Sequence, residues 1–199
     1  IVKDINLSVE QGKPISLVGP SGSGKTTLLA IMAGLDLPTS GTVTLLGSQI
    51  TILDEDKRAQ IRGKDVGFVF QSFHLMPRLT ALDNVMLPLE ISGDPYSMDK
   101  AQEALKQVGL SKRAKHFATQ LSGGEKQRVA IARSIVNKPK ILFADEPTGN
   151  LDKKSSGSIT DLLFSLNELI NTTLVLVTHD LSLAEKCDEV YELDEGRLL

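Results

Sequence analysis

Short apolar runs and longer segments with helical spacing alternate along this chain. Apolar runs of strand length that are bounded by turn residues predict buried strands. These runs are 15–18, 66–70, 140–145 and 173–178. Further strands are expected where apolar and polar residues alternate or a short β-type run occurs, at 1–9, 41–46 and 190–193. Buried strands that recur between helices favour a mainly parallel sheet that is covered on both faces.

Apolar positions that recur every three to four residues predict helices between these strands. The expected helices are 25–33, 54–62, 81–91, 98–108, 122–136, 155–170 and 181–186. Gly34 should end the first of them, and Pro88 should kink the third. The segment 72–137 contains no convincing strand, which indicates a helical subdomain inserted into an α/β core. One domain, 1–199, is therefore expected, with its core formed by 1–71 and 138–199.

A glycine-rich segment separates the first buried strand from the first helix. Residues 19–26 read Gly-Pro-Ser-Gly-Ser-Gly-Lys-Thr and fit G-x-x-x-x-G-K-[ST], the P-loop pattern. Its glycines let the backbone approach a ligand, and the N–H groups at a helix N-terminus form a nest for phosphates. Lys25 offers a positive charge to the outer phosphates, and the Thr26 hydroxyl is placed to bind Mg²⁺. The predicted nucleotide-binding residues are Gly19, Pro20, Ser21, Gly22, Ser23, Gly24, Lys25, Thr26 and Thr27. The alternative, a glycine-rich turn followed by a chance Lys-Thr pair, leaves the flanking strand and helix unexplained.

Two acidic residues follow the buried strand that ends at Ala144. Ligands of open α/β sheets bind beyond the carboxyl ends of the strands. Asp145 is therefore placed to hold Mg²⁺, directly or through water, and Glu146 to accept a proton from an attacking water. The alternative is a solvated acidic turn, which the upstream P-loop disfavours.

Residues 121–125, Leu-Ser-Gly-Gly-Glu, precede a long amphipathic helix. Ser122 is a plausible N-cap, and Glu125 completes a capping box. Two consecutive glycines nevertheless cost helix stability. A second phosphate group that approaches this helix N-terminus would explain them. The alternative is that the segment is only a well-capped helix start.

Charge and composition limit the classes of function. The net charge of −3 gives no reason to expect nucleic-acid binding through a basic surface. The single cysteine, Cys187, cannot form an internal disulfide, which favours a reducing compartment and a packing role. No run approaches the roughly 20 apolar residues of a membrane-spanning helix, so any membrane connection is expected through a partner.

Six motifs occur together in one order and resemble those of ATP-binding cassette (ABC) ATPases of the transporter type. They are a Walker A segment at 19–26, a Q-loop glutamine at Gln71, a signature at 121–125, a Walker B strand at 141–146, a D-loop at 149–152 and a switch histidine at His179. The stretches 67–77, 79–85 and 146–152 further resemble the lipoprotein-release and macrolide-export group, and within it the chain resembles ATPases of the YbbA type.

The resemblance implies an α/β fold with a P-loop NTPase core, an N-terminal antiparallel β part and an inserted helical lobe. It implies an ATPase with ATP and Mg²⁺ as cofactors and with Glu146, His179 and Gln71 as catalytic residues. Thr26, Gln71 and Asp145 are the implied metal ligands. Two copies are expected to dimerise head to tail, each ATP lying between one Walker A segment and the partner's signature residues, Ser122, Gly123, Gly124 and Glu125. Asp152 is expected to act across the dimer, although as an N-cap it would need no such role.

The resemblance also implies membrane permease subunits as partners and no nucleic acid. The chain is then expected in the cytoplasm, peripheral on the inner face of the cell membrane. Phe73, Leu75 and Met76 follow Gln71 in a predicted loop, and either the inner face of the helical lobe or a groove for a permease helix would explain these apolar residues.

Two other readings compete with a transporter subunit. One is a soluble ABC ATPase acting on nucleic acid or ribosomes; the segment 72–120 is too short for the long coiled coil of the DNA-repair relatives. The other is a regulatory ATP-binding module without turnover, against which Glu146 and His179 argue. The adenine-stacking aromatic of the family would lie upstream of residue 1, and Ala118 stands where relatives often have proline.

Overall fold

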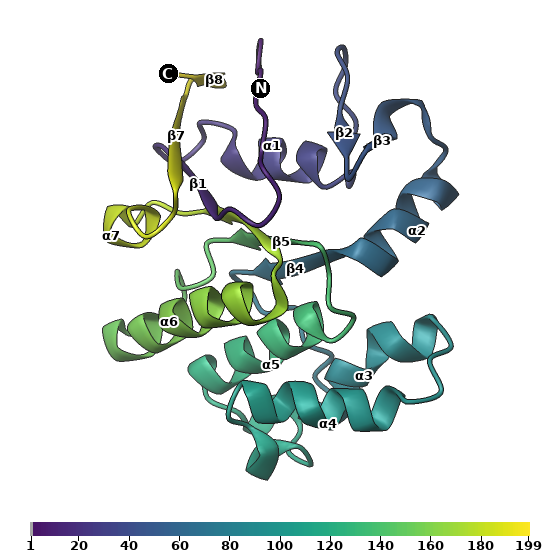
Figure 1. Ribbon diagram of the computed structural model, residues 1–199. Helices are drawn as coiled ribbons and strands as arrows, with labels where there is room; N and C mark the ends of the chain where they lie inside the picture. Colours follow the sequence, from purple (N-terminus) through teal and green to yellow (C-terminus); the bar gives the residue numbers. More distant parts are fainter. Residues whose placement is uncertain (1) are drawn as a thin grey trace.

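The computed structural model describes residues 2–199, and one sheet of six strands runs through this part of the chain (Figure 1). The strand order is β4 (Val66–Phe70), β5 (Ile141–Asp145), β6 (Thr173–Val177), β1 (Ile15–Val18), β7 (Glu189–Asp194) and β8 (Arg197–Leu198). Neighbouring strands pair in parallel from β4 to β7, and β8 pairs with β7 in antiparallel fashion. A separate antiparallel pair joins β2 (Thr44–Leu45) to β3 (Ser48–Gln49). The predicted α/β fold with a mainly parallel sheet is confirmed.

Helices cover both faces of this sheet. They are α1 (Lys25–Met32), α2 (Glu55–Asp65), α3 (Ala81–Ile91), α4 (Ser97–Gln107), α5 (Gly123–Ile135), α6 (Lys153–Ile170) and α7 (Leu181–Ala184). Short 3₁₀ helices occur at Ile50–Ile52, Ser111–Arg113 and Ala118–Gln120. Figure 1 shows α5 and α6 below the sheet and α1 above it, with α3 and α4 beyond α5. Helix α5 contacts β4, α3, α4 and α6, so it joins the helical part to the sheet.

Alternate side chains of the central strands supply two separate cores, because successive residues of a strand point to opposite faces. Leu142 and Ala144 of β5 pack in the core that contains α3 to α6. Ile141 and Phe143 pack in the core beside α1. Strand β6 divides in the same way: Leu174 and Leu176 pack in the first core, and Val175 and Val177 pack in the second. This explains why 174–177 are all apolar and why the whole strand is buried.

The boundaries of the helical part are set by side-chain caps. Thr80 and Ser122 each form a capping box, at the starts of α3 and α5. Pro88 lies inside α3. The division into a core and a lobe spanning 72–137 stays a prediction.

The expected strand at 1–9 is wrong for the described residues 2–9, which form no strand, and residue 1 lies outside them. The apolar residues of this segment pack partly buried against the core beside α1, and the backbone of Lys3 donates one hydrogen bond to Gly196 O. The alternation therefore reflects side-chain burial without a backbone ladder. The strand expected at 41–46 shortens to β2, because Leu46 (φ 51°) and Gly47 (φ 81°) leave the extended region and turn the chain.

Candidate functional site

The first residue of the P-loop, Gly19, packs closely against the backbone of β7. Gly19 has φ 145°, and a Cβ atom there would lie 2.0 Å from the carbonyl oxygen of Leu193 in β7. Only glycine fits this position. Gly24 (φ 104°) then serves as the N-cap of α1 and offers no side-chain cap. Within the described chain, the N–H groups of the first turn of α1 therefore have no side-chain acceptor, as an anion site requires.

Lys25 is a mostly buried cation whose partners are backbone carbonyls. Its side chain is 8% exposed, and Nζ donates to Gly19 O and Pro20 O, at 2.8 Å each. No carboxylate within 2–199 forms a salt bridge with it. The Ser23 hydroxyl is buried nearby in the loop, and no residue of the described chain forms a hydrogen bond with it. A buried positive charge at a helix N-terminus fits an anionic ligand such as a nucleotide phosphate.

Thr26 and Asp145 meet where α1 begins and β5 ends. The Thr26 hydroxyl donates to Asp145 Oδ2 at 3.1 Å. Burial raises the pKa of Asp145 and the Glu146 carboxylate adds to this, while the Thr26 hydrogen bond and Lys25 lower it. A hydroxyl and a carboxylate are hard oxygen ligands that fit Mg²⁺. Across the described chain there is no cluster of three or more His, Cys, Asp or Glu that could hold a metal, so a cation here would depend on the phosphates of a nucleotide as well.

Glu146 and His179 face each other across the ends of β5 and β6. His179 Nδ1 lies 2.9 Å from the Glu146 carboxylate. Glu146 adopts φ 46°, an unusual conformation for a residue with a side chain, and its N–H donates to Val177 O at 2.9 Å. Such strain persists only where the surroundings hold it, and it is common at functional sites. The carboxylate is thus held at the sheet edge, where it can accept a proton.

These residues line one cavity of ≈ 440 Å³ at the carboxyl edge of the sheet. Its lining residues are Ser21, Gly22, Gly24, Lys25, Thr26, Thr27, Gln71, Asp145, Glu146, Val177 and His179. They come from the P-loop with the start of α1 and from the ends of β4, β5 and β6, which meet here because parallel strands bring their carboxyl ends to one edge. The structure therefore brings the predicted Walker A, Q-loop, Walker B and histidine residues together. Gly19, Pro20 and Ser23 belong to the same loop but do not line the cavity.

The predicted signature residues lie outside this cavity. Ser122 Oγ accepts the N–H of Glu125, and Glu125 accepts the N–H of Ser122, a hydrogen bond that lowers the pKa of its carboxyl. Arg113 Nε donates to the same carboxylate at 2.8 Å. A Cβ on Gly123 would lie 3.4 Å from Leu151, so the signature lies beside the D-loop. Within this chain, the start of α5 does not reach the cavity that contains Lys25.

Asp152 caps α6 through its carboxylate, which accepts the N–H groups of Lys154 and Ser155. Ser155 Oγ donates to Asp152 Oδ2 at 2.8 Å and would lie 3.3 Å from a Cβ on Gly124, so Asp152 lies beside the signature and does not line the cavity. A role across a dimer stays a prediction.

Three residues that contact the site had no assigned role in the sequence. Asn150 hydrogen-bonds Gln71 twice, Gln127 donates to Pro147 O at 2.6 Å, and Arg133 binds the carbonyls of Phe73 and His74. Gln127 and Arg133 lie in the amphipathic α5 without a local signal. Asn150 lies in the D-loop, and its contact with a residue 79 positions away depends on the fold.

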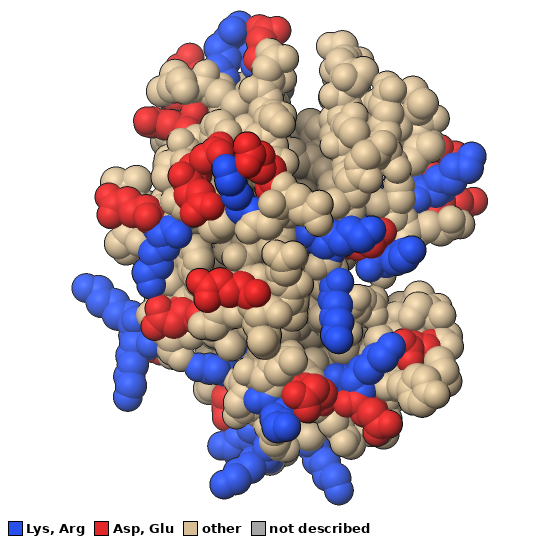
Figure 2. Space-filling view, viewed as in Figure 1, with Lys and Arg blue, Asp and Glu red and all other residues tan. Residues whose placement is uncertain are grey.

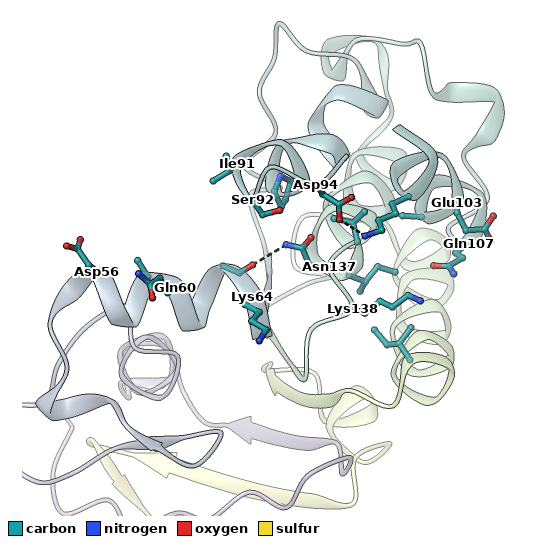
Figure 3. A pocket seen from close by; sticks show the side chains of 18 residues that line it. Asp56, Gln60, Lys64, Ile91, Ser92, Asp94, Glu103, Gln107, Asn137 and Lys138 are labelled. Atoms are coloured by element: carbon teal, nitrogen blue, oxygen red, sulfur yellow. Dashed lines mark hydrogen bonds and ion pairs between the residues drawn. The ribbon is translucent and has the colours of Figure 1, made fainter. Parts of the chain in front are cut away.

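A larger cavity of ≈ 930 Å³ lies between α2, one side of α4 and the C-terminal ends of α3 and α5 (Figure 3). Gln60 and Lys64 approach it from α2, and Ser92, Asp94 and Asn137 from the helical part. It contains none of the predicted site residues. Figure 2 shows basic and acidic side chains mixed over one face of the molecule, without a continuous basic surface there. No helix in the described 2–199 is both long and apolar enough to span a membrane.

Comparison with known proteins matches residues 2–149 to the family model described as ABC transporter. The uncharacterized ABC transporter ATP-binding protein YbbA of Escherichia coli strain K12 is 54% identical over 200 aligned positions, which cover 100% of this chain and 88% of the relative. The lipoprotein-releasing system ATP-binding protein LolD of Xanthomonas campestris pv. campestris strain 8004 is 47% identical, covering 98% of this chain and 82% of the relative.

A solved structure of the ATP-binding cassette MJ0796, a dimer in a post-hydrolysis state bound to ADP and Pi, superimposes with a TM-score of 0.90 at 43% identity. The match covers 99% of this chain and 88% of the other. The family model and these relatives extend over the P-loop, the signature and the strand-end acids alike. By sequence and by fold, the chain belongs to the ATP-binding proteins of ABC transporters.

Proposed function

We propose that the ≈ 440 Å³ cavity binds ATP together with Mg²⁺ and hydrolyses it to drive a membrane permease of the lipoprotein-release or macrolide-export type. The observation that carries this proposal is the buried Lys25 ammonium at the N-terminus of α1, which among residues 2–199 is held by P-loop carbonyls alone. Lys25 and the N–H groups of the P-loop bind the phosphates. Thr26, Asp145 and Gln71 hold the cation, which when bound neutralises phosphate charge and orients the outer phosphate.

Hydrolysis requires a group that accepts a proton from water. Glu146 has this role, because its carboxylate lines the cavity one residue beyond Asp145. His179, 2.9 Å from that carboxylate, orients it and presents its imidazole to the outer phosphate. The held backbone of Glu146 keeps the carboxylate in place between turnovers.

A second copy of this chain supplies the signature. The start of α5 carries Ser122, Gly123 and Gly124 with their N–H groups, yet it lies outside the chain's own cavity. A head-to-tail dimer would place it on the partner's nucleotide, and Asp152 beside it would act across the same interface. MJ0796, which is similar to this chain, forms a dimer bound to ADP and Pi. This resemblance supports a homodimer that closes on ATP.

The permease docks on the segment after Gln71. Leu75 packs against the core that contains α3 to α6, so it stabilises the fold. Met76 is 52% exposed and is available to a partner. Docking here would place the subunit in the cytoplasm, peripheral on the inner face of the membrane. The relatives belong to transport systems by name, which favours this reading over an ATPase that acts on nucleic acid or ribosomes.

The test of the proposed function is Glu146→Gln, with Glu185→Gln as a matched control at an exposed position in the turn after α7. Loss of a general base lowers the rate by about 10²–10⁴-fold. Glu146→Gln should bind Mg·ATP, accumulate as a dimer in light scattering and hydrolyse ATP at least about 10²-fold more slowly. Glu185→Gln should match the wild type. Turnover near the wild-type rate in Glu146→Gln would refute the assigned role.

A further inference from the structure

Gln71 and Asn150 hold each other at two points. Gln71 Nε2 donates to Asn150 Oδ1 at 3.2 Å, and Asn150 Nδ2 donates to the backbone oxygen of Gln71 at 3.0 Å. The first bond fixes the side chain of Gln71, and the second fixes its backbone. The contact joins the end of β4 to the turn that follows β5.

The first bond decides which end of the Gln71 amide is available to the cavity. Nε2 is engaged by Asn150, whereas Oε1 accepts no hydrogen bond from any described residue. Gln71 lines the cavity, and a hard cation binds an amide oxygen rather than an amide nitrogen. An amide whose nitrogen is held cannot exchange its two ends without breaking that bond. Asn150 therefore keeps the oxygen of Gln71 as the end that remains free.

The neighbouring glycine provides the space for this contact. A Cβ on Gly149 would lie 2.7 Å from Gln71 Nε2 and 3.2 Å from its Cδ. Any side chain at 149 would displace the amide of Gln71. Gly149 thus leaves room for the amide of Gln71, and Asn150 holds that amide by a hydrogen bond.

The turn that carries Asn150 is itself held in place. Gly149 N donates to Glu146 O at 3.0 Å, and the fully buried Gln127 donates to Pro147 O at 2.6 Å. Asn150 is therefore fixed relative to Glu146, and through Asn150 so is Gln71. The spacing between the proposed proton acceptor and the proposed amide ligand is set by this turn.

We propose that Asn150 is a positioning residue for hydrolysis: it orients the Gln71 amide so that Oε1 faces the cation site, and Gly149 leaves the space that this orientation needs. Asn150 itself touches neither nucleotide nor water. The inference rests on the proposed role of Gln71. Small displacements of groups in an active site lower rates by up to about 10²-fold, so loss of this orientation should be visible in turnover.

The first test is a double-mutant cycle with Gln71→Ala, Asn150→Ala and the double variant. Asn137→Ala is the matched control, because Asn137 also donates its amide to a backbone oxygen, that of Gly63. Both residues precede the parallel strands β5 and β4, whereas the site lies beyond the carboxyl ends of these strands. Asn150→Ala should lower kcat about 10-fold and raise the Mg²⁺ concentration needed for half-maximal rate, and the double variant should be no slower than Gln71→Ala within about 2-fold. Asn137→Ala should match the wild type.

The second test needs no turnover. In nucleotide-free protein, the ¹⁵N side-chain amide resonance of Gln71, assigned by its absence from Gln71→Ala, should shift in Asn150→Ala and stay in place in Asn137→Ala. Gly149→Ala should shift the same resonance and lower kcat. The control Gly157→Ala, in α6 with nothing within 4 Å of the added Cβ, should do neither.

The two tests distinguish the positioning role of Asn150 from the proposed role of Gln71 in hydrolysis. Wild-type turnover in Asn150→Ala, multiplicative losses in the double variant, or an unmoved Gln71 resonance would each overturn the role of Asn150 alone. Wild-type turnover in Gln71→Ala would overturn the proposed role of Gln71 and the inference with it.

Discussion

Arg133 holds the loop after Gln71 in a conformation that it would not adopt alone. Phe73 (φ 59°) and His74 (φ 48°) are consecutive residues in the left-handed region, where each costs about 1–3 kcal/mol. Arg133 Nη2 donates to Phe73 O at 2.9 Å, and Nη1 donates to His74 O at 2.7 Å. Burial lowers the pKa of Arg133, which nevertheless stays charged. No ion pair of Arg133 occurs in the described chain, so these two carbonyls are its compensation.

Arg133→Ala should therefore destabilise the fold and release the loop. A hydrogen bond from a charged donor contributes about 1.5–3 kcal/mol, and Arg133 forms two of them. Water at the exposed His74 and relief of the backbone strain offset part of their loss, so we expect a net loss of about 2–3 kcal/mol. For a chain of this size, that loss lowers the melting temperature by about 4–12 °C. The loop should relax to negative φ, and the backbone around Phe73 should become accessible to protease.

Urea unfolding measures the loss of stability, and limited proteolysis with chymotrypsin, which cleaves after aromatic residues, measures the release of the loop. Arg128→Ala is the matched control in the same helix, since Arg128 also donates to a backbone oxygen, that of Val108, at 2.9 Å. It should lose stability without faster cleavage after Phe73. The reasoning is refuted if Arg133→Ala unfolds at the wild-type urea concentration, or if cleavage after Phe73 is no faster than in Arg128→Ala.

The remaining predictions concern the cavity and the docking segment. Lys25→Ala removes the buried cation and should weaken binding of a fluorescent ATP analogue at least about 10-fold, whereas unchanged affinity would show that the backbone nest alone binds. The pKa of Asp145 lies above its ordinary value of 3.8, so the folded chain binds this proton more tightly than the unfolded chain, and stability is lost as pH rises above that value. Asp145→Asn removes the cost of burying this carboxylate in its charged form, so at pH 7 it should raise the melting temperature of the nucleotide-free chain. It should also abolish Mg²⁺-dependent hydrolysis. A lower melting temperature would contradict the direction of the pKa shift. Met76→Lys should keep basal ATPase activity and lose permease in a pull-down, and retained binding would place docking elsewhere.

The sequence predicts elements well where local pattern and burial agree. Strands β1 and β4 and helix α3 have the predicted bounds, because each is bracketed by glycine, by a cap or by a change of period. The strand predicted at 1–9 was wrong for the described residues 2–9, because alternating apolar side chains can be buried without backbone hydrogen bonds to a neighbouring strand. Pattern reports which side chains are buried, but it does not report which backbone groups pair.

In the candidate site, too, the sequence predicts the residues that lie in local motifs and misses the contacts that tertiary packing creates. The P-loop is a local motif, and Asp145 and His179 follow from the rule that ligands bind at strand ends. The contacts of Asn150 and Arg133 could not be predicted, since their partners lie 79 and about 60 residues away. Asn150 lies in the D-loop motif, but the motif does not identify its partner, and nothing in the local sequence marks Arg133. Tertiary packing alone brings these side chains to the loop that carries Gln71.

The central claim is that each hydrolytic site combines the cavity of one copy with the signature of another. A mixing experiment tests it directly, with Lys25→Ala copies and Gly123→Asp copies, each nearly inactive alone. Gly123 has room for a side chain, with its nearest neighbour 3.4 Å from the added Cβ, and a carboxylate at a helix N-terminus leaves the helix stable while repelling phosphate. In an equal mixture that pairs at random, about half of the dimers contain one copy of each variant. Each mixed dimer has one site with both substitutions and one intact site, so the mixture should recover up to about one quarter of wild-type ATPase activity. Activity of the mixture that stays at the average of the two variants assayed separately would contradict the account.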